Sequence, residues 1–226
     1  MISQYTIDNV KVYKYVMPII TSNMYILIMD KQALIIDPNE SEEAMELLED
    51  CGVTDITILL THEHFDHISG VNSFREKWPC KVYGNNQCKE MVEDPAKNLA
   101  AFFMAMFISK PEEERRIAQS LFAEDYACQV DVGFEKEYNM KFKGLSVKMI
   151  DTPGHSSGSI CILVDDKYIF SGDSLVEGNK VITRLPGGSR KEYNQITRPF
   201  LESLSEDIIV FPGHGTEGYL KDFELG

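Results

Sequence analysis

All five histidines of this chain lie in three short segments of the sequence. Residues 61–67 read Thr-His-Glu-His-Phe-Asp-His, and each of the other two histidines directly follows a Pro-Gly pair. Neutral imidazole is the commonest protein ligand of first-row metals, and carboxylates complete such sites. Because scattered histidines would not gather in this way, the pattern predicts that the chain binds metal, with two ions at one site.

The candidate ligands divide into two sets that a further carboxylate can join. Residues 62–67 are too close together to share one helical face, so we expect them on an irregular loop from which side chains converge. The expected ligands are His62, His64 and His155 for one ion, Asp66, His67 and His214 for the other, and Asp173 as a bridge. Two metals held about 3.5–4 Å apart can share a hydroxide and bind both the attacking and the leaving oxygen.

This ligand set favours hydrolysis. Bound zinc lowers the pKa of water to about 7, which supplies a metal-bound hydroxide at neutral pH. Asp66 is the expected catalytic residue, because its carboxylate would orient this hydroxide or take up its proton. A metal would polarise the carbonyl or phosphoryl oxygen of the substrate. The sequence shows no separate general acid, which favours thioesters or activated esters.

The elements that must position these residues are predicted from apolar patterning. Residues 55–60 form a short apolar run, typical of a strand buried on both faces, and they end directly at Thr61. Further strands are expected over 10–16, 23–29, 31–37, 81–83, 138–151, 159–171 and 207–211, and helices over 40–50, 67–77 and 191–203. In layered α/β proteins, ligands usually bind at the carboxyl ends of strands, which is where the histidine segments fall.

These elements predict a single α/β domain over residues 1–226, folded as a four-layer αββα sandwich. Residues 86–128 form a helical insertion, and within it residues 99–108 are apolar nearly all round. Three interpretations of this stretch stay open. It packs in the core, it forms a substrate lid in which Phe103 and Phe107 line an apolar pocket, or it is a homodimer interface.

Four ordered motifs resemble those of metallo-β-lactamase-fold hydrolases, and specifically the glyoxalase II-like (hydroxyacylglutathione hydrolase-like) branch. They are Thr-His-Glu-His-Phe-Asp-His (61–67), Thr-Pro-Gly-His-Ser-Ser-Gly-Ser (152–159), Ser-Gly-Asp-Ser-Leu (171–175) and Phe-Pro-Gly-His-Gly (211–215). The resemblance implies the same sandwich and metal roles for the seven ligands named above. It also implies hydrolysis with two Zn²⁺ ions, with iron or manganese as alternatives.

The chain departs from this branch in two places. Hydroxyacylglutathione hydrolases of the long form carry a C-terminal helical domain, whereas only residues 216–226 follow the last motif here. Many short relatives have an arginine where this chain has Ile182, so an anchor for a substrate anion is expected to be lost or moved to Arg184 or Lys180. Both departures weaken the expectation of a glutathione thioester as the substrate.

Composition limits the partners of the protein. With 22 basic and 36 acidic residues the net charge is −14, which disfavours nucleic acids and anionic membranes as partners and favours a small-molecule substrate. Five cysteines without a Cys-x-x-Cys pair fit reduced thiols. Residues 1–5 contain no basic leader, and no apolar stretch reaches the roughly 20 residues of a membrane span, so a cytoplasmic location is expected.

The leading expectation is therefore a dinuclear zinc hydrolase of a small thioester, ester or lactone. One alternative resembles the persulfide dioxygenases, with a single iron held by His62, His155 and Asp173. Another is a phosphodiesterase or RNA-processing enzyme, against which the acidity of the chain weighs. A secreted β-lactamase, a flavodiiron-type electron carrier and a non-catalytic metal-binding regulator are less favoured.

Overall fold

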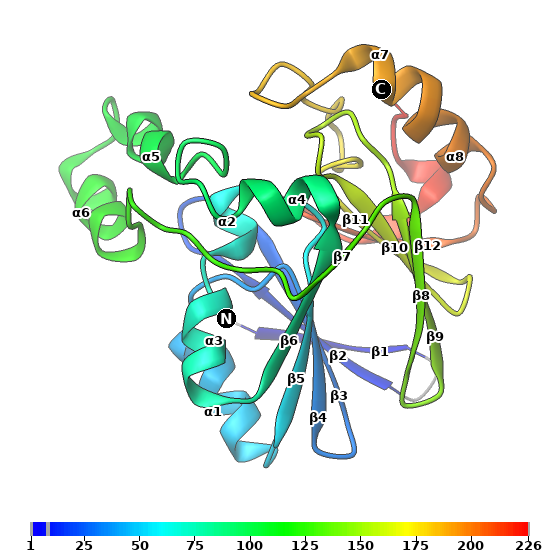
Figure 1. The fold of residues 1–226 in the computed structure, drawn as a ribbon, viewed down its shortest axis with the longest axis horizontal. Coiled ribbons are helices and arrows are strands. Elements are labelled where there is room, and N and C mark those ends of the chain that lie inside the picture. Colours follow the sequence, from blue (N-terminus) through cyan, green and yellow to red (C-terminus); the bar gives the residue numbers. More distant parts are fainter. Residues whose placement is uncertain (1, 8–9, 226) are drawn as a thin grey trace.

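Two β-sheets lie face to face at the centre of the protein, and helices cover the outer surface of each sheet (Figure 1). The computed structural model describes residues 2–7 and 10–225. Its layers confirm the αββα sandwich and the α/β class that the sequence predicts.

Within the described residues, the first sheet has seven strands in the order β1 to β7. The strands are β1 Ile2–Ile7, β2 Val10–Val16, β3 Asn23–Met29, β4 Gln32–Ile36, β5 Asp55–Leu59, β6 Cys80–Asn85 and β7 Val132–Phe134. Neighbours from β1 to β4 pair antiparallel, and those from β4 to β7 pair in parallel. The carboxyl ends of β4, β5 and β6 therefore meet at one edge.

The second sheet has six strands in the described part of the chain, in the order β13-β12-β11-β10-β9-β8. They are β8 Glu137–Phe142, β9 Leu145–Asp151, β10 Ile160–Val164, β11 Tyr168–Gly172, β12 Ile209–Pro212 and β13 Gly218–Tyr219. Neighbours pair antiparallel except β11 and β12, which are parallel. The strand predicted over residues 207–211 is present as β12, but it is not the final strand, since β13 follows and pairs with it.

The helices are short and lie mainly outside the sheets (Figure 1). They are α1 Glu42–Asp50, α2 Phe65–Ile68, α3 Val71–Lys77, α4 Asn86–Met91, α5 Ala100–Phe103, the 3-10 turn η1 Met104–Phe107, α6 Glu112–Leu121, α7 Arg190–Glu192, the π-helical η2 Tyr193–Thr197, α8 Arg198–Glu202 and the 3-10 turn η3 Leu220–Asp222. None of the helices described here has the length and apolar character that crossing a bilayer requires.

Alternation along the strands builds two kinds of core. On β3, Tyr25 and Leu27 belong to the cluster between the sheets, whereas Met24 and Ile26 belong to the cluster that includes side chains of α1 and α3. Successive side chains of a strand point to opposite faces, so a strand buried on both faces is apolar throughout. This is the physical basis of the continuous apolar run that predicts β5.

The helix predicted over residues 67–77 is wrong in its start and its continuity. The structure has α2 and α3 instead, separated at Gly70. A Cβ at Gly70 would collide with the backbone carbonyl of Asn39, so only glycine permits this close approach. The expected irregular loop for the histidine motif is corrected as well, because the motif ends in the helical turn α2, closed by a 2.9 Å hydrogen bond from His67 N to His64 O.

The insertion over residues 86–128 contains α4, α5, η1 and α6 and extends beyond one end of the first sheet (Figure 1). Phe103 and Phe107 are buried in a cluster that includes Phe65 of α2 and Phe122. The core-packing interpretation therefore holds for Phe103 and Phe107. The lid and homodimer interpretations of the insertion stay predictions.

Candidate metal centre

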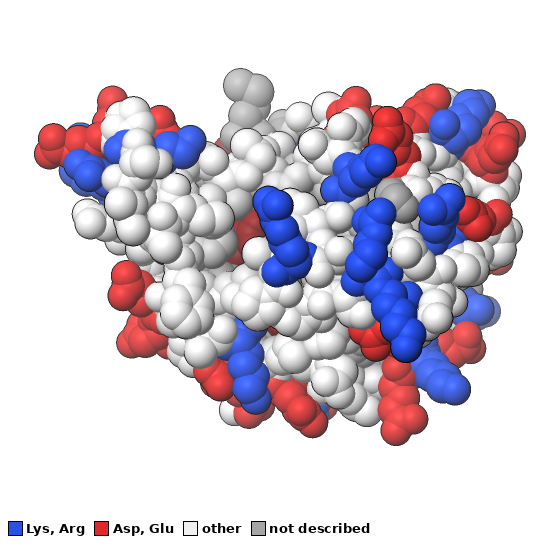
Figure 2. All heavy atoms as spheres, turned by 90° about the horizontal axis from the view of Figure 1, so that it is seen from above, with Lys and Arg blue, Asp and Glu red and all other residues white. Residues whose placement is uncertain are grey.

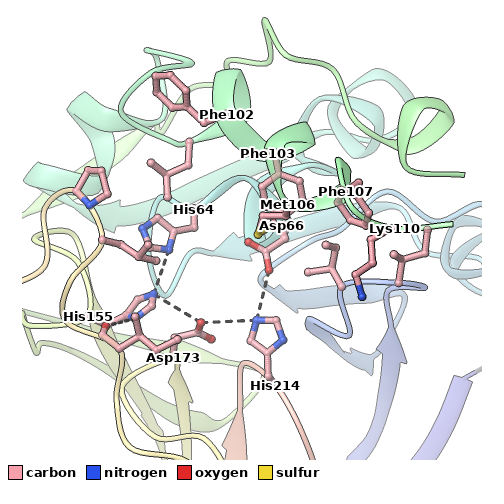
Figure 3. Close-up of a pocket in the computed structure, with 16 residues that line it drawn as sticks. His64, Asp66, Phe102, Phe103, Met106, Phe107, Lys110, His155, Asp173 and His214 are labelled. Carbon is pink, nitrogen blue, oxygen red and sulfur yellow. Dashed lines mark hydrogen bonds and ion pairs between the residues drawn. The ribbon is translucent and has the colours of Figure 1, made fainter. Parts of the chain in front are cut away.

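Every predicted ligand follows a strand at the same edge of the sandwich. Residues 62–67 follow β5, His155 follows β9, Asp173 follows β11 and His214 follows β12. Figure 3 shows donor side chains from all four segments pointing toward a common centre. The fold thus brings together side chains as far apart in the sequence as His67 and His214, which are separated by 147 positions.

His62, His64 and His155 form the first cluster. Their donor atoms lie within 4.8 Å of one another, and all three residues are buried. His155 Nε2 is 3.0 Å from His64 Nδ1. Each ring can direct one nitrogen at a shared point, which is the grouping predicted for the first ion.

Asp66, His67 and His214 form the second cluster, again with donor atoms within 4.8 Å of one another. Asp66 Oδ2 is 3.4 Å from His67 Nε2 and 3.3 Å from His214 Nε2. The two imidazole nitrogens are 3.3 Å apart. This is the grouping predicted for the second ion.

Asp173 lies between the two clusters. Its Oδ2 is 3.6 Å from His155 Nε2 in the first cluster and 3.6 Å from His214 Nε2 in the second. Its Oδ1 is 3.5 Å from His67 Nε2. A carboxylate whose Oδ2 is equally far from one histidine of each cluster has the placement expected of the predicted bridge.

Three buried donor atoms of this centre have no hydrogen-bond partner, namely His62 Nε2, His64 Nε2 and Asp173 Oδ1. A buried polar atom without a partner costs about 1–3 kcal/mol. A cation at this centre would give His62 Nε2 and Asp173 Oδ1 a partner, and in the first cluster it would meet His64 Nδ1, which faces His155 Nε2. The residues present therefore fit bound divalent metal.

The imidazoles of the first cluster are neutral. Burial lowers the pKa of all three rings, to about 3 for His64, and neighbouring imidazoles lower the pKa of His62 and His64 further. Neutral imidazole is the form that ligates metal. This cluster is thus in the ligating protonation state over the physiological pH range.

The carboxylates of the centre are ionised. Burial alone would raise the pKa of Asp66 and Asp173, but the His67 and His214 imidazoles beside them lower it overall. In return, Asp66 and Asp173 raise the pKa of His67 to about 10, although burial alone would lower it. Without a metal, a proton on His67 therefore offsets the negative charge of these carboxylates, and a divalent cation bound there would displace that proton.

Asp37 supports the second cluster and is not among the residues that the sequence identifies. Its carboxylate accepts hydrogen bonds from Thr61 N at 2.7 Å, from Thr61 Oγ1 at 2.6 Å and from His67 Nδ1 at 3.1 Å. The last contact leaves His67 Nε2 to face the cluster. The available signal was an acidic residue at the carboxyl end of β4, the parallel neighbour of β5.

Replacing Asp37 by alanine is expected to weaken metal binding at the second cluster by about 10–100-fold, because His67 loses the partner that orients its ring. Competition with a chromophoric chelator measures the affinity. Asp165→Ala is a matched control, since Asp165 also accepts a backbone hydrogen bond, from Ser146 N, but lies at the opposite end of β11. Unchanged affinity in Asp37→Ala would contradict this role.

Side chains of β3 hold the turn that carries His214. Asn23 Nδ2 donates to Pro212 O at 2.9 Å and to Gly215 O at 3.0 Å, and the Tyr25 hydroxyl donates to Pro212 O at 2.7 Å. The first sheet thereby positions a candidate ligand that follows a strand of the second sheet. Contacts of this kind have no sequence signature, because their acceptors are backbone carbonyls.

A cavity of about 570 Å³ lies against the donor side chains (Figure 3). Among the described residues, its lining consists of Ile19, Ile20, His64, Asp66, Leu99, Phe102, Phe103, Met106, Phe107, Lys110, His155, Asp173, Ile182, Leu185, Pro186 and His214. Apart from the donor residues and Lys110, these side chains are apolar. The volume is that of a small-molecule site, which commonly measures roughly 300–1,000 Å³.

The predicted substrate residues differ in their placement. Phe103 and Phe107 line the cavity, whereas Lys180 and Arg184 are exposed and lie outside its lining, although Ile182 between them belongs to it. Figure 2 shows basic side chains gathered over α7 and the loop before it. A substrate contact by Lys180 or Arg184 would therefore be made at the rim, and it stays a prediction.

Comparison with known sequences gives one family and modest identities. The pattern of the metallo-beta-lactamase superfamily matches residues 18–214. The probable metallo-hydrolase YqgX of Bacillus subtilis is 31% identical over 200 residues, which cover 88% of this chain and 87% of that protein. The hydroxyacylglutathione hydrolase GloC of Haemophilus influenzae is 27% identical over 190 residues, which cover 83% of this chain and 82% of that protein.

Solved structures match over nearly the whole chain. The crystal structure of the BLEG-1 B3 metallo-beta-lactamase has a TM-score of 0.73 and 27% identity, and the match covers 98% of this chain and 95% of that one. The structure of TTHA1623 in a di-iron-bound form has a TM-score of 0.70 and 26% identity, with 92% and 94% covered.

Proposed function

The chain belongs to the metallo-beta-lactamase superfamily, and from that membership we propose that it hydrolyses a small thioester, ester or lactone with the help of two zinc ions. The observation that carries this proposal is the pair of donor clusters, with Asp173 between them, against one cavity. A relative named as a hydroxyacylglutathione hydrolase supports an acyl compound as the substrate.

The metal ions and the protein side chains would make different contributions to the reaction. When bound, two divalent ions lower the pKa of water and polarise the substrate carbonyl. Asp66 is ionised and lies in the lining of the cavity, so its carboxylate can accept a proton from the attacking water. The walls of the cavity are apolar, and apolar surroundings strengthen the electrostatic interactions with the reacting group.

The leaving group is the basis for placing thioesters first. Among the described residues that line the cavity, Lys110 is the only side chain beyond the donor groups that carries a titratable proton. A thiolate departs without being protonated, whereas an amine requires a general acid. We therefore rank thioesters before esters and lactones, and all three before amides.

Two alternative functions would give a role to fewer residues of the site. A mononuclear iron oxygenase built on His62, His155 and Asp173 would leave Asp66 and the rest of the second cluster without a role. A phosphodiesterase acting on nucleic acid would need basic contacts, whereas the net charge is −14 and the walls of the cavity are apolar. Iron in place of zinc stays open, because one solved relative is di-iron-bound.

The test is a screen of the purified protein after separate reconstitution with zinc, iron and manganese. Thioesters, esters, lactones and phosphodiesters are offered as hydrolysis substrates, and oxygen uptake is followed with glutathione persulfide. We expect thioester hydrolysis without oxygen uptake. Oxygen consumption by the iron form, with no hydrolysis by any form, would favour the oxygenase instead.

Removing metal is expected to abolish hydrolysis and to destabilise the fold, because unpaired buried donors and carboxylates then face one another. Returning zinc at about 100 times its dissociation constant should stabilise the protein by about 2.7 kcal/mol per site. Thermal unfolding of the chelated and restored protein measures this change. Magnesium is the control, since it prefers oxygen ligands and should restore little. A chelated protein with full activity would exclude the metal role.

A further inference from the structure

The cavity is apolar on the side of His64 and carries the cationic Lys110, beside Phe107, on the opposite side, with the donor groups between them (Figure 3). Figure 3 shows Phe102 on the side of His64, and Lys110 on the side of Asp66 and His214. A substrate whose reacting bond lies over the donor groups would therefore extend toward both sides.

The apolar side is accessible as well as apolar. Phe102, Met106 and Ile182 line the cavity, yet they are 59%, 53% and 49% exposed. Phe102 and Met106 belong to the insertion, whereas Ile182 belongs to the loop before α7. Figure 2 shows the surface between these two elements as largely uncharged. Large apolar side chains that remain exposed together mark a binding surface, and here that surface adjoins the reacting groups.

The cationic side is the ammonium group of Lys110. Its ion pair with Glu114 is 3.8 Å long, and the two side chains are 52% and 40% exposed. An exposed pair of this kind contributes about 0–1 kcal/mol, so a bound anion can compete with Glu114 for the ammonium group. Because the chain as a whole carries a charge of −14, an anionic substrate depends on such local positive charge.

We propose, on the basis of the hydrolase function above, that the substrate is an amphiphilic acyl compound. An apolar chain on one side of the scissile bond packs against Phe102, Met106 and Ile182, and an anionic group on the other side is bound by Lys110. For a thioester, water adds its oxygen to the acyl carbon and the C–S bond breaks. The products are a carboxylic acid and a thiol, with one proton of water passing to the thiolate.

The experiment compares matched thioesters on the zinc-loaded protein. S-Hexanoyl mercaptoacetate carries its charge on the thiol, and S-hexanoyl mercaptoacetamide is its neutral isostere. Hexanethiol esterified to succinate or to succinamic acid gives the reversed pair. In one of the two pairs, we expect the kcat/KM of the charged thioester to be about tenfold higher than that of its neutral isostere. Lengthening the apolar chain should add about three- to fourfold per methylene until the cavity is filled.

Variants assign these preferences to residues. Lys110→Glu should abolish the preference for the charged thioester over its neutral isostere. Lys97→Glu makes the same charge change at an exposed residue of the insertion outside the cavity lining, so it should keep the preference. Phe102→Ala should reduce the gain from chain length. Equal rates for charged and neutral substrates, or a charge preference that survives Lys110→Glu, would overturn the proposal.

A binding measurement separates failure of this proposal from failure of the hydrolase function. The thioether S-hexyl mercaptoacetate cannot be hydrolysed, and calorimetry should show that it binds the wild type about tenfold more tightly than Lys110→Glu. Binding without hydrolysis of any thioester, ester or lactone would contradict the hydrolase function but leave the cavity assignment intact. Absence of binding, together with a dimer that Phe102→Glu dissociates, would show that a second copy covers the apolar side chains.

Discussion

Replacing Asp66 by asparagine is expected to lower kcat/KM for the best hydrolysis substrate by about 10³-fold. Asparagine keeps the size of the side chain but removes the negative charge that lies 3.4 Å from His67 Nε2 and 3.3 Å from His214 Nε2. Under the proposed mechanism, the variant loses a proton acceptor and also a ligand of the second ion. Both losses act on the same step, so their effects should not add independently.

Metal content separates the two causes. Activity that stays low when the variant holds as much zinc as the wild type identifies loss of the proton acceptor. Asp151→Asn is the matched control, because Asp151 ends β9 and accepts a 2.9 Å hydrogen bond from Asn85 outside the cavity. An Asp66→Asn enzyme that keeps more than about a tenth of the wild-type kcat/KM would remove Asp66 from the catalytic role.

Replacing Phe65 by alanine is expected to give the largest loss of stability, about 3–5 kcal/mol. Phe65 is 1% exposed, and its ring centroid lies 5.2 Å from Phe103, 5.6 Å from Phe122 and 5.2 Å from Tyr126. The substitution leaves a cavity where α2 meets the insertion. Denaturant unfolding measures the loss directly, and the thermal midpoint should fall by about 10 °C.

Phe102→Ala is the control for this substitution. Phe102 belongs to the same insertion but is 59% exposed, so its truncation should change stability by no more than about 0.5 kcal/mol. Similar losses in Phe65→Ala and Phe102→Ala would show that the cluster does not anchor the insertion. Phe65 also precedes Asp66, so we expect weaker zinc binding at the second cluster in Phe65→Ala.

Two side chains of the insertion, the candidate lid, both anchor it and line the cavity. Phe103 and Phe107 belong to the cluster around Phe65 and also line the cavity. Truncating either residue would therefore lower the stability of the protein and also alter the cavity, so the two effects could not be separated. Substitutions at Phe102 and Met106 separate these effects, because both side chains line the cavity and are largely exposed.

Errors in the predicted elements arose where distant backbone groups decide the local conformation. The turn α2 was expected as an irregular loop, yet Phe65 N donates a 2.9 Å hydrogen bond to Asn98 O in the insertion. A contact across 33 positions leaves no trace in the local pattern of residues 62–67. Asp37 was missed for the same reason, since its role depends on lying beside Thr61 and His67 in the folded sheet.

The residue sequence by itself determined the layered fold and the identity of the candidate ligands. Continuous apolar runs, as on β3, define strands with two buried faces, and that pattern requires packing on both sides of the sheet. Histidine is rare in this chain and is confined to strand ends, so the residues that can ligate metal lie where ligands usually bind. Both signals lie within short stretches of sequence, so they can be recognised without knowledge of the fold.

Tertiary structure alone decided the cavity and its polarity. Ile19, residues 99–110 and residues 182–186 are far apart in the chain, and only the packing of the insertion and the loop before α7 against the sandwich makes them one lining. The same packing places Lys110 on one side of the donor groups and leaves Arg184 outside the lining. A side chain's neighbours across a cavity depend on where separate segments dock, and no pattern within any one of these segments encodes that arrangement.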